Sequence, residues 1–398
     1  MIFNVDRSGR LARGGAVYLD CAATTRTAPE VCAAMLAHLD GTKGFGNASS
    51  GQHETGRQAA EQIELARSDV AAELRCAPEE VVFTSGATES INLALRGIAL
   101  ANAQHGRHIV TTQIEHKATL ACCDALTDEG FEVTRVPPSH DGRVDPEAIA
   151  AAVRSDTLLV SVMYINNETG VIQPLREIAA VAEERGVLLH VDAAQAAGKF
   201  PIDLSNMAID LLSLSAHKFH GPKGVGCLFI RDRPRLRLRP LIFGGGQEFG
   251  LRSGTLPTHQ VVGLAAALKL ASKNRDRDRE HLSRLREQFV SALSDRVPLR
   301  INGAVDAASP YIVNLSVPGI SSDALINQCA ADIAIASGSA CSSGTVEPSH
   351  VLRAMGMEGD PLYGAVRVSF DRYHTSADID AAVGAIARSV KRIKEMDA

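Results

Sequence analysis

The sequence contains no tryptophan, and only 4% of its residues are aromatic. No stretch approaches the ~20 consecutive apolar residues that a membrane-spanning helix needs, and Met1 to Gly15 lacks the apolar core of a signal peptide. Basic residues are not in excess, because 41 Lys and Arg face 46 Asp and Glu. The net charge of −5 excludes a global attraction to nucleic acid or to anionic membranes. We therefore expect a soluble, cytoplasmic protein.

Cysteine pairs of the type that binds zinc are also missing. The chain has eight cysteines but no CxxC pair. Zinc ribbons use such pairs, and disulfide frameworks are typical of short secreted chains. We therefore expect no metal site and no disulfide framework, and most of the cysteines should be buried as small apolar residues.

The composition that remains is that of a large globular protein. Of the 398 residues, 45% are hydrophobic and 22% charged, which suits one large or two ordinary domains with substantial cores. From about Tyr18 to Arg231, short β-rich runs alternate with helical patterns, as in a mostly parallel sheet covered by helices. Strands are predicted at residues 81–85, 108–112, 158–163, 188–191, 211–215 and 226–230. Helices are predicted at residues 29–38, 58–74, 88–103, 116–129, 146–153 and 175–185.

The second part of the chain begins with a long helical pattern at residues 261–296. Its charged middle, residues 273–280 (KNRDRDRE), interrupts the apolar spacing and predicts a bend or loop there. Strands near residues 299–302, 311–317, 333–336 and 365–370, with helices at 322–329, 348–355 and 377–394, indicate a smaller α+β domain. We therefore predict a large α/β domain at residues 16–260 and a small C-terminal domain at residues 261–398, with residues 1–15 packing on the small domain.

One candidate binding feature is a strand that leads into a helix through glycine. The segment VVFTSGATES (residues 81–90) runs a strand through Gly86 into a helix that begins at Ala87 and Thr88. Unpaired N–H groups at a helix N-terminus favour an anion such as phosphate. An ordinary βα turn with a small N-cap has the same pattern, so this segment alone leaves both interpretations open.

Two further features follow later strands of the same domain. Asp192 comes after an apolar run, in the crevice where open α/β sheets bind ligands, and SAHKFHGPKG places Ser215, His217 and Lys218 at the end of another strand. A lysine that leaves a buried strand can be desolvated and its amine made nucleophilic. The lysine, the carboxylate and the helix end are together the parts of a pyridoxal phosphate site: a covalent partner, a partner for the ring nitrogen and an anion cradle.

Seven motifs occur in order from Tyr18 to Gly344: YLDCAATT, SGATES, NNETG, HVDAAQ, SAHKFHGPKG, RSGT and SGSACSSG. By these motifs the chain closely resembles the IscS/NifS-type cysteine desulfurases, class V members of the fold type I pyridoxal-phosphate enzymes, over nearly its full length. The resemblance implies a large, mostly parallel-sheet α/β domain and a smaller α+β C-terminal domain. It also implies conversion of L-cysteine to L-alanine, with the sulfur left on an enzyme cysteine as a persulfide for delivery to acceptor proteins.

The resemblance also implies which residues form the site. Lys218 would bind pyridoxal 5'-phosphate covalently and move the Cα proton of the substrate, whereas Lys117 and Lys223 do not match the motif. Asp192 would keep the ring nitrogen protonated, and Gln195 would hydrogen-bond the phenolic oxygen. His116 would stack on the ring and act in proton transfer, and the phosphate would contact Ala87, Thr88, Ser215 and His217. Asn167 would contact the cofactor and, together with Arg367, bind the substrate carboxylate. Thr255 would reach the phosphate of the partner subunit in a homodimer.

Cys341 would carry the persulfide. It lies in ASGSACSSGTVEP among small residues that leave a backbone mobile, and the length of this segment is similar to that of the family group with a long, mobile loop. Without the other motifs it would be a loop cysteine of no function. A thiol with a pKa of ~8.5 is mostly protonated at neutral pH, so activation by His116 or by the substrate's own proton chemistry is required.

Several positions keep a simpler interpretation when taken alone. His116 is then a surface residue of a loop, Arg367 part of an exposed strand face, and RSGT a plain turn. Phe249 replaces an arginine common in the family, and Cys21 is expected to be structural although it lies near the site. The alternating arginines from Arg231 to Arg239 favour a solvated edge over a surface for nucleic acid.

Other functions share part of this pattern. A selenocysteine lyase or another class V enzyme, such as an aminotransferase, would share the fold and the cofactor. A non-catalytic scaffold that binds a sulfur acceptor would not need the lysine, the carboxylate, the histidine and the cysteine together. The acceptor also stays open, because iron–sulfur scaffolds, tRNA-thiolation enzymes and DNA-phosphorothioation proteins all draw on this family.

Overall fold

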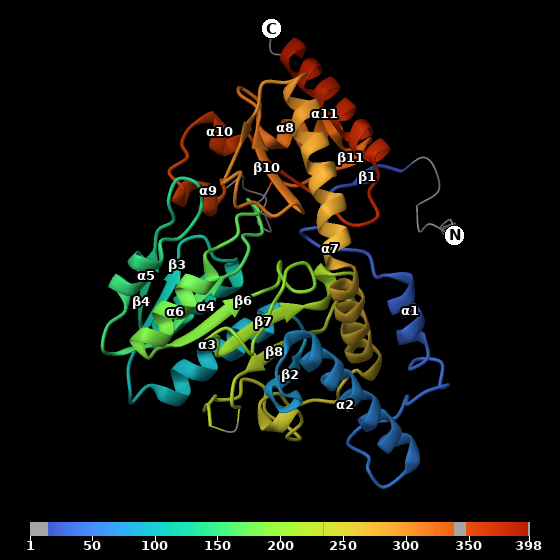
Figure 1. Ribbon diagram of the computed structural model, residues 1–398, viewed down its shortest axis with the longest axis vertical. Coiled ribbons are helices and arrows are strands. Elements are labelled where there is room, and N and C mark those ends of the chain that lie inside the picture. Colours follow the sequence, from blue (N-terminus) through green and yellow to red (C-terminus); the bar gives the residue numbers. More distant parts are fainter. Residues whose placement is uncertain (1–14, 234, 338–347, 397–398) are drawn as a thin grey trace.

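A seven-stranded sheet lies at the centre of the larger part of the molecule, in the strand order β2-β8-β7-β6-β5-β3-β4 (Figure 1). The computed structural model describes residues 15–233, 235–337 and 348–396. The strands are β2 (Val81–Thr84), β3 (His108–Thr112), β4 (Glu132–Val136), β5 (Thr157–Met163), β6 (Leu188–Asp192), β7 (Leu211–Ser215) and β8 (Gly226–Ile230). β8 is antiparallel to both of its neighbours and the other pairs are parallel, as predicted for a mostly parallel sheet.

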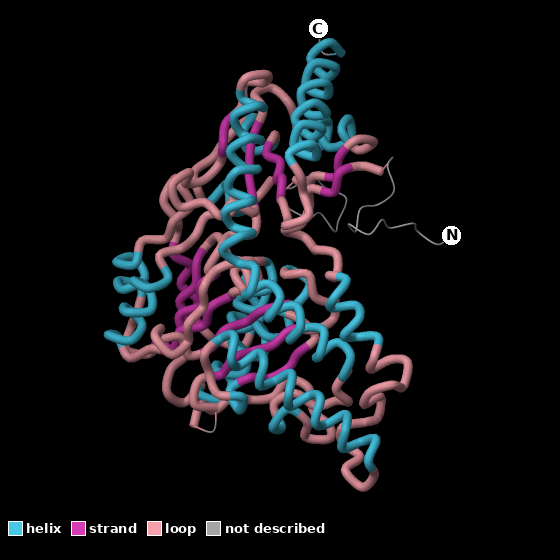
Figure 2. The backbone as a smooth tube through the Cα atoms, turned by 45° about the vertical axis from the view of Figure 1, so that its right-hand side comes forward, coloured by secondary structure: helices cyan, strands magenta, loops and turns pink. Residues whose placement is uncertain are grey.

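Helices cover both faces of this sheet, as the cyan and magenta tubes of Figure 2 show. Successive strand residues point to opposite faces, and each face has its own apolar core. Val82, Ile109 and Leu228 belong to one core, and Phe83 and Val110 belong to the other. The helices are α1 (Pro29–Leu36), α2 (Glu54–Leu74), α3 (Ala87–Asn102), α4 (Lys117–Asp128), α5 (Pro146–Ala152) and α6 (Leu175–Arg185). α3 and α4 pack on the first core, and α2 and α6 pack on the second.

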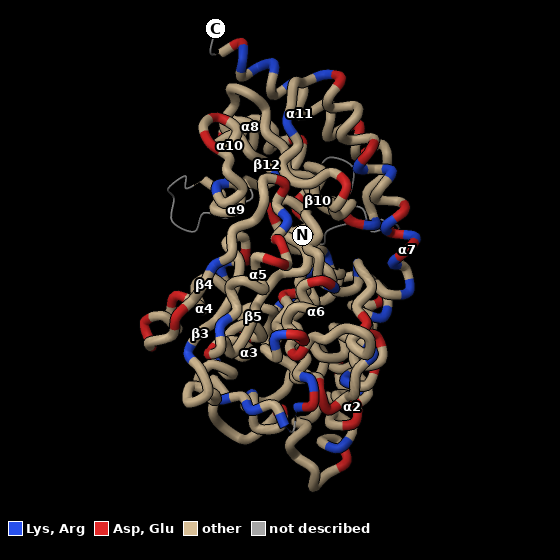
Figure 3. The backbone as a smooth tube through the Cα atoms, turned by 60° about the vertical axis from the view of Figure 1, so that its left-hand side comes forward, with Lys and Arg blue, Asp and Glu red and all other residues tan. Residues whose placement is uncertain are grey.

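A single long helix, α7 (Thr258–Ser294), connects this part to the C-terminal part (Figure 1). The predicted bend at residues 273–280 is wrong, because α7 is continuous over 37 residues. Figure 3 shows acidic and basic residues interspersed along it. Residues 273–280 contain no glycine or proline, and their lysine, arginine and glutamate residues are good helix formers. Asp278 is buried and its carboxylate pairs with Arg372 at 2.7 Å, so the charged stretch still packs on the protein.

The C-terminal part is built on a small antiparallel sheet in the order β12-β10-β9. Its elements are β9 (Arg300–Ile301), β10 (Ile312–Ser316), α8 (Ser322–Cys329), β11 (Ile333–Ala334), α9 (His350–Ala354), α10 (Asp360–Tyr363), β12 (Ala365–Ser369) and α11 (Ser376–Met396). β1 (Val17–Tyr18) pairs in parallel with β11, so the start of the described chain joins this part. The predicted packing of residues 1–15 falls almost entirely outside the described residues. No helix in the described part of the chain is long and apolar enough to cross a membrane.

Candidate active site

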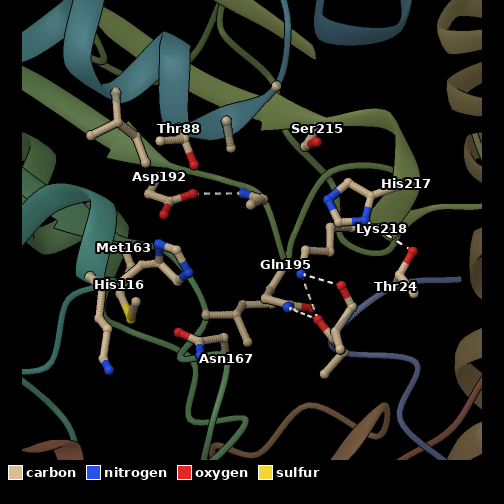
Figure 4. A pocket seen from close by; sticks show the side chains of 18 of the residues that line it. Thr24, Thr88, His116, Met163, Asn167, Asp192, Gln195, Ser215, His217 and Lys218 are labelled. Atoms are coloured by element: carbon tan, nitrogen blue, oxygen red, sulfur yellow. Dashed lines mark hydrogen bonds between the residues drawn. The ribbon is translucent and has the colours of Figure 1, made fainter. Parts of the chain in front are cut away.

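A cavity of about 590 Å³ opens where β6 and β7 end and α3 begins, a size typical of small-molecule sites. The sequence-predicted residues that line it, most of them labelled in Figure 4, are Ala87, Thr88, His116, Asn167, Asp192, Gln195, Ser215, His217, Lys218 and Arg367. Thr255 does not line this cavity and is exposed. Cys341 lies outside the described residues.

Lys218 enters the cavity from a short 3-10 turn that follows β7. Its Nζ donates hydrogen bonds to the carbonyl oxygens of Ala22 and Ala23, at 2.7 and 2.8 Å (Figure 4). Burial, followed by the charge of Arg367, lowers the pKa of this lysine to about 8, against the opposing effect of nearby carboxylates. Near neutral pH a larger fraction of this amine is therefore uncharged than for an exposed lysine, as bond formation with an aldehyde requires.

Asp192 is the last residue of β6 and is only 6% exposed. Its Oδ1 accepts the backbone N–H of Ala194 at 2.9 Å. Burial raises the pKa of this carboxyl, and the Ala194 hydrogen bond and the charges of His116 and Lys218 oppose that shift. Among the described residues the Asp192 carboxylate accepts the Ala194 N–H and feels the charges of His116 and Lys218, and a ligand cation placed against it would further compensate its desolvation.

His116 caps the N-terminus of α4, and its ring lies in the cavity near Asp192 (Figure 4). Its Nδ1 accepts the backbone N–H of Ala118 at 3.1 Å. Because that N–H can only donate, Nδ1 carries no proton and the neutral ring holds its proton on Nε2. His116 is exposed along the cavity, and desolvation by the surrounding residues lowers its pKa, which favours this neutral form. The ring can therefore stack on a flat ligand while presenting an N–H.

The first turn of α3 forms a polar end of the cavity. Gly86 caps this helix with a φ of +149°, a conformation that side-chain-bearing residues rarely adopt, and a Cβ there would lie 3.4 Å from Ser215 Oγ. The N–H groups of Ala87 and Thr88 have no preceding helical turn to pair with. The hydroxyls of Thr88 and Ser215 add donors at the same end. This arrangement suits a phosphate, which the helix dipole also stabilises.

Gln195 lies beside Lys218 in the cavity wall and is 5% exposed (Figure 4). Its Nε2 donates to the carbonyl oxygen of Ala22 at 2.9 Å, and its Oε1 accepts from the ammonium of Lys199 at 3.2 Å. Since a carboxamide nitrogen has two hydrogens, one N–H of Gln195 remains for a ligand.

Arg367 reaches the same cavity from β12, in the C-terminal part. It is 6% exposed, which excludes the interpretation of a solvent-exposed strand position. Its Nη2 pairs with Asp20 Oδ1 at 2.7 Å, and its Nη1 donates to the carbonyl oxygen of Asn167 at 2.9 Å. A buried guanidinium held in this way at a cavity wall is suited to a substrate carboxylate.

The residues present fit pyridoxal phosphate. The cavity has a desolvated amine, a buried carboxylate, and a helix end where glycine leaves the space that a Cβ would fill. These groups match the aldehyde, the ring nitrogen and the phosphate of the cofactor in turn. No other group is needed to explain why the carboxylate of Asp192 is buried here.

Sequence reasoning missed several polar residues of the cavity. Thr24 Oγ1 lies 3.1 Å from His217 Nδ1, and burial lowers the pKa of His217 to about 4, so its ring is neutral. Glu168 and His350 also line the cavity, and Glu168 Oε2 accepts the hydroxyl of Ser349 at 2.5 Å. These contacts join segments far apart in the sequence, so only the positions of Thr24 within YLDCAATT and of Glu168 within NNETG could have indicated them.

The structure accounts for Cys21, which was expected to be structural, and for Phe249, which replaces an arginine common in the family. Cys21 is 2% exposed, and burial raises the pKa of its thiol well above the usual range, so it is not a reactive thiolate. The guanidinium carbon of Arg233 lies 3.6 Å from the centroid of the Phe249 ring, and that of Arg67 lies 5.1 Å from the same centroid. The guanidinium of Arg233 thus lies at the position where the family has an arginine, whereas the charge of Arg67 is paired with Glu248.

Arg67→Ala should destabilise the fold near the glycine-rich segment at residues 244–250 (GGGQEFG) by about 3 kcal/mol or more, because it would leave the buried Glu248 carboxylate without its ion-pair partner. Arg67 and Glu248 form a bidentate pair with Nη2–Oε1 at 2.7 Å, and their side chains are 3% and 1% exposed. The matched control is Arg57→Ala on the same helix, whose pair with Glu54 is 53% and 66% exposed and should contribute at most about 0.5 kcal/mol. Equal denaturant midpoints for both variants would contradict this account.

Comparison with known proteins agrees with the geometry. The family model described as aminotransferase class-V matches residues 17–382. The cysteine desulfurase IscS of Vibrio campbellii is 44% identical over 382 residues, covering 96% of this chain and 94% of that protein.

Solved structures give the same result. One titled as a NifS-like protein superposes with a TM-score of 0.88 at 37% identity, covering 94% of this chain and 99% of that one. Another, titled SspA in complex with cysteine, has a TM-score of 0.81 at 35% identity and covers 90% of this chain and all of that one. The family match over residues 17–382 spans both parts of the fold. The chain belongs to the aminotransferase class-V family, among the cysteine desulfurases of the IscS and NifS type.

Proposed function

We propose that the protein is a pyridoxal-phosphate-dependent cysteine desulfurase that converts L-cysteine to L-alanine and leaves the sulfur as a persulfide on Cys341. The observation that carries the proposal is the meeting, in one cavity, of a desolvated lysine, a buried carboxylate and a buried arginine from the other part of the fold. The related structure titled as a complex with cysteine supports the substrate.

Each residue has a task that follows from its surroundings. Arg367 and Asn167 would bind the substrate carboxylate, which fixes the Cα–H bond relative to Lys218. Lys218 would hold the cofactor covalently and then, as a free amine, take and return the Cα proton. When bound, pyridoxal phosphate supplies an electron sink for the bonds that break at the substrate. Asp192 would stabilise the positive charge on its ring nitrogen, and Gln195 would donate to its phenolic oxygen.

The sulfur step belongs to Cys341. Its thiolate would attack the sulfur of the substrate, so that an S–S bond forms as the Cβ–S bond of the substrate breaks, and alanine leaves after protons return to carbon. The neutral His116, with its proton on Nε2, is placed to exchange that proton with the substrate or the thiol. The segment that carries Cys341 begins two residues after Ala336, whose backbone pairs with that of Arg367.

A product assay tests the proposed activity. Purified protein loaded with pyridoxal phosphate should release one alanine for each cysteine consumed, and sulfide should appear when a thiol reductant is present. A selenocysteine lyase would show this activity with selenocysteine and little with cysteine. An aminotransferase would form a keto acid rather than alanine, and a non-catalytic scaffold would consume no cysteine.

The exposure of Thr255 supports a homodimer in which this residue completes the phosphate site of the partner subunit. Lys218→Ala and Thr255→Ala subunits, each nearly inactive alone, should then form heterodimers with one intact site when mixed. Activity should recover to a substantial fraction of wild type, up to about half per heterodimer. A protein that is monomeric by light scattering while fully active would contradict the shared site.

The setting of the activity is also a proposal. The described cysteines are free, as is usual in the reducing cytoplasm, where we place the protein. Acceptors of the persulfide would be proteins of iron–sulfur assembly, tRNA thiolation or DNA phosphorothioation. We further propose a division into a cofactor-binding domain at residues 16–260 and a small domain at residues 261–398, which contributes Arg367 and Cys341.

A further inference from the structure

Lys199 lies behind Gln195 and has no part in the steps proposed above. It is in the turn after β6 and is only 7% exposed. Its ammonium donates to Gln195 Oε1 at 3.2 Å and lies 5.1 Å from the ring centroid of Tyr311. The adjacent Gly198 has a φ of +71°, and a Cβ on it would lie 2.6 Å from the Cβ of Ala271 on α7. The turn is thus packed tightly against α7, with a lysine buried inside.

Burying an ammonium is costly, so its partners matter. Burial and the charge of Lys218 lower the pKa of Lys199 to about 7, while Cys21 and Asp371 oppose that shift. Although burial acts against it, the hydrogen bond and charge of His374 hold the pKa of Asp371 well below its usual range, so Asp371 is a carboxylate. The groups whose charge interacts with that of Lys199 are Lys218, Cys21, Asp371, His217 and His220, and the ring of Tyr311 lies beside its amine.

The contact with Gln195 determines which way its carboxamide points. The carbonyl of Ala22 can only accept, so the atom that faces it must be the nitrogen, which leaves the oxygen toward Lys199, whose amine can donate in either protonation state. The two contacts agree, and the orientation is set by chemistry on both sides. The second N–H of Gln195 is then left on the cavity side, beside Lys218.

We propose that Lys199 is a positioning residue that holds Gln195 with its amide N–H toward the phenolic oxygen of the cofactor. This inference rests on the proposed function for the identity of the cofactor. A cation on the oxygen of the amide polarises it, so that its N–H donates more strongly to a phenolate. When the phenolate is stabilised, it attracts the proton on the neighbouring Lys218–cofactor nitrogen less strongly, so the proton affinity of that nitrogen falls. The positive charge of Lys199 lowers this affinity as well.

Lys199→Met tests this on the holoenzyme without substrate. The visible absorption of the Lys218–cofactor linkage changes when its nitrogen loses a proton. The readout is the pH at the midpoint of that change. The midpoint should move upward by about one pH unit, a tenfold gain in proton affinity. In a Gln195→Leu background the same substitution should change that affinity by about twofold or less, because the residue through which Lys199 acts is gone.

Lys269→Met is the matched control, since Lys269 is on α7, pairs with Asp69 at the surface and is 62% exposed. The pH midpoint of the Lys269→Met holoenzyme should equal that of wild type. An unshifted midpoint in a folded Lys199→Met protein, or an equal shift in the Gln195→Leu background, would overturn the proposal. If Lys199→Met does not fold, Lys199→Gln retains a donor without the charge and should move the midpoint upward by less, whereas no shift would overturn the proposal. A wild-type protein that binds no cofactor would instead overturn the proposed function.

Discussion

Cys341→Ser should abolish cysteine turnover while the visible absorption of the bound cofactor stays as in wild type. The groups that we assign to the cofactor all lie in the described part of the chain, outside residues 338–347, so the variant should still bind pyridoxal phosphate and cysteine. What it should lose is sulfur transfer, because a serine hydroxyl at neutral pH is a far weaker nucleophile than a thiolate and forms no stable sulfur adduct. We expect the rate of alanine formation to fall by about 10³-fold or more, as for the loss of other catalytic nucleophiles.

Cys32→Ser is the matched control, since Cys32 is an exposed free cysteine on α1, which does not line the cavity. It should turn over cysteine at the wild-type rate. If Cys341→Ser also turns over cysteine at the wild-type rate, the proposal that sulfur is transferred through Cys341 is wrong, whatever the absorption spectrum shows.

Lys218→Ala should lose both the covalent linkage to the cofactor and the activity, again by about 10³-fold or more. The amine of Lys218 lies in the cavity, held by the carbonyls of Ala22 and Ala23, with a pKa lowered to about 8. Borohydride reduction of wild-type holoenzyme should therefore fix the cofactor to the peptide that contains Lys218.

The linkage should also form faster at higher pH, since the neutral amine is the reactive form. Cofactor-free protein mixed with pyridoxal phosphate should react at a rate that rises through a pH of about 8, the pKa of this lysine, rather than at the higher pH of an exposed lysine. Reduction that labels a peptide with Lys117, Lys223 or Lys199 instead, or that labels the Lys218→Ala variant, would contradict the assignment.

Much of the α/β fold follows from local sequence. The bounds of β3, β7, β8 and α6 were predicted residue for residue, because buried strands have continuous apolar runs and α6 has a clear apolar period. β4 (Glu132–Val136) was missed, since it lies at the edge of the sheet and four of its five residues are not buried. The bend in α7 was predicted wrongly because a buried ion pair, which no periodicity reveals, replaces apolar packing at Asp278.

The site shows the same division. Asp192 ends one strand and Lys218 follows the next, so sheet topology brings them to one edge and sequence reasoning could predict their proximity. The contribution of Arg367 came from resemblance, because it depends on how the C-terminal part packs against the sheet. Lys199 could not be found by pattern, since a lysine after a strand is usually exposed and only its burial against Gln195 reveals its role.

The most direct test of the account is mass spectrometry of the wild-type holoenzyme after brief treatment with L-cysteine and no reductant. The account predicts that the peptide containing Cys341 gains the mass of one sulfur atom, in proportion to the alanine released, and that a thiol reductant removes it. Sulfur found on the peptide of Cys21 or Cys329, or alanine released with no added sulfur on Cys341, would contradict it.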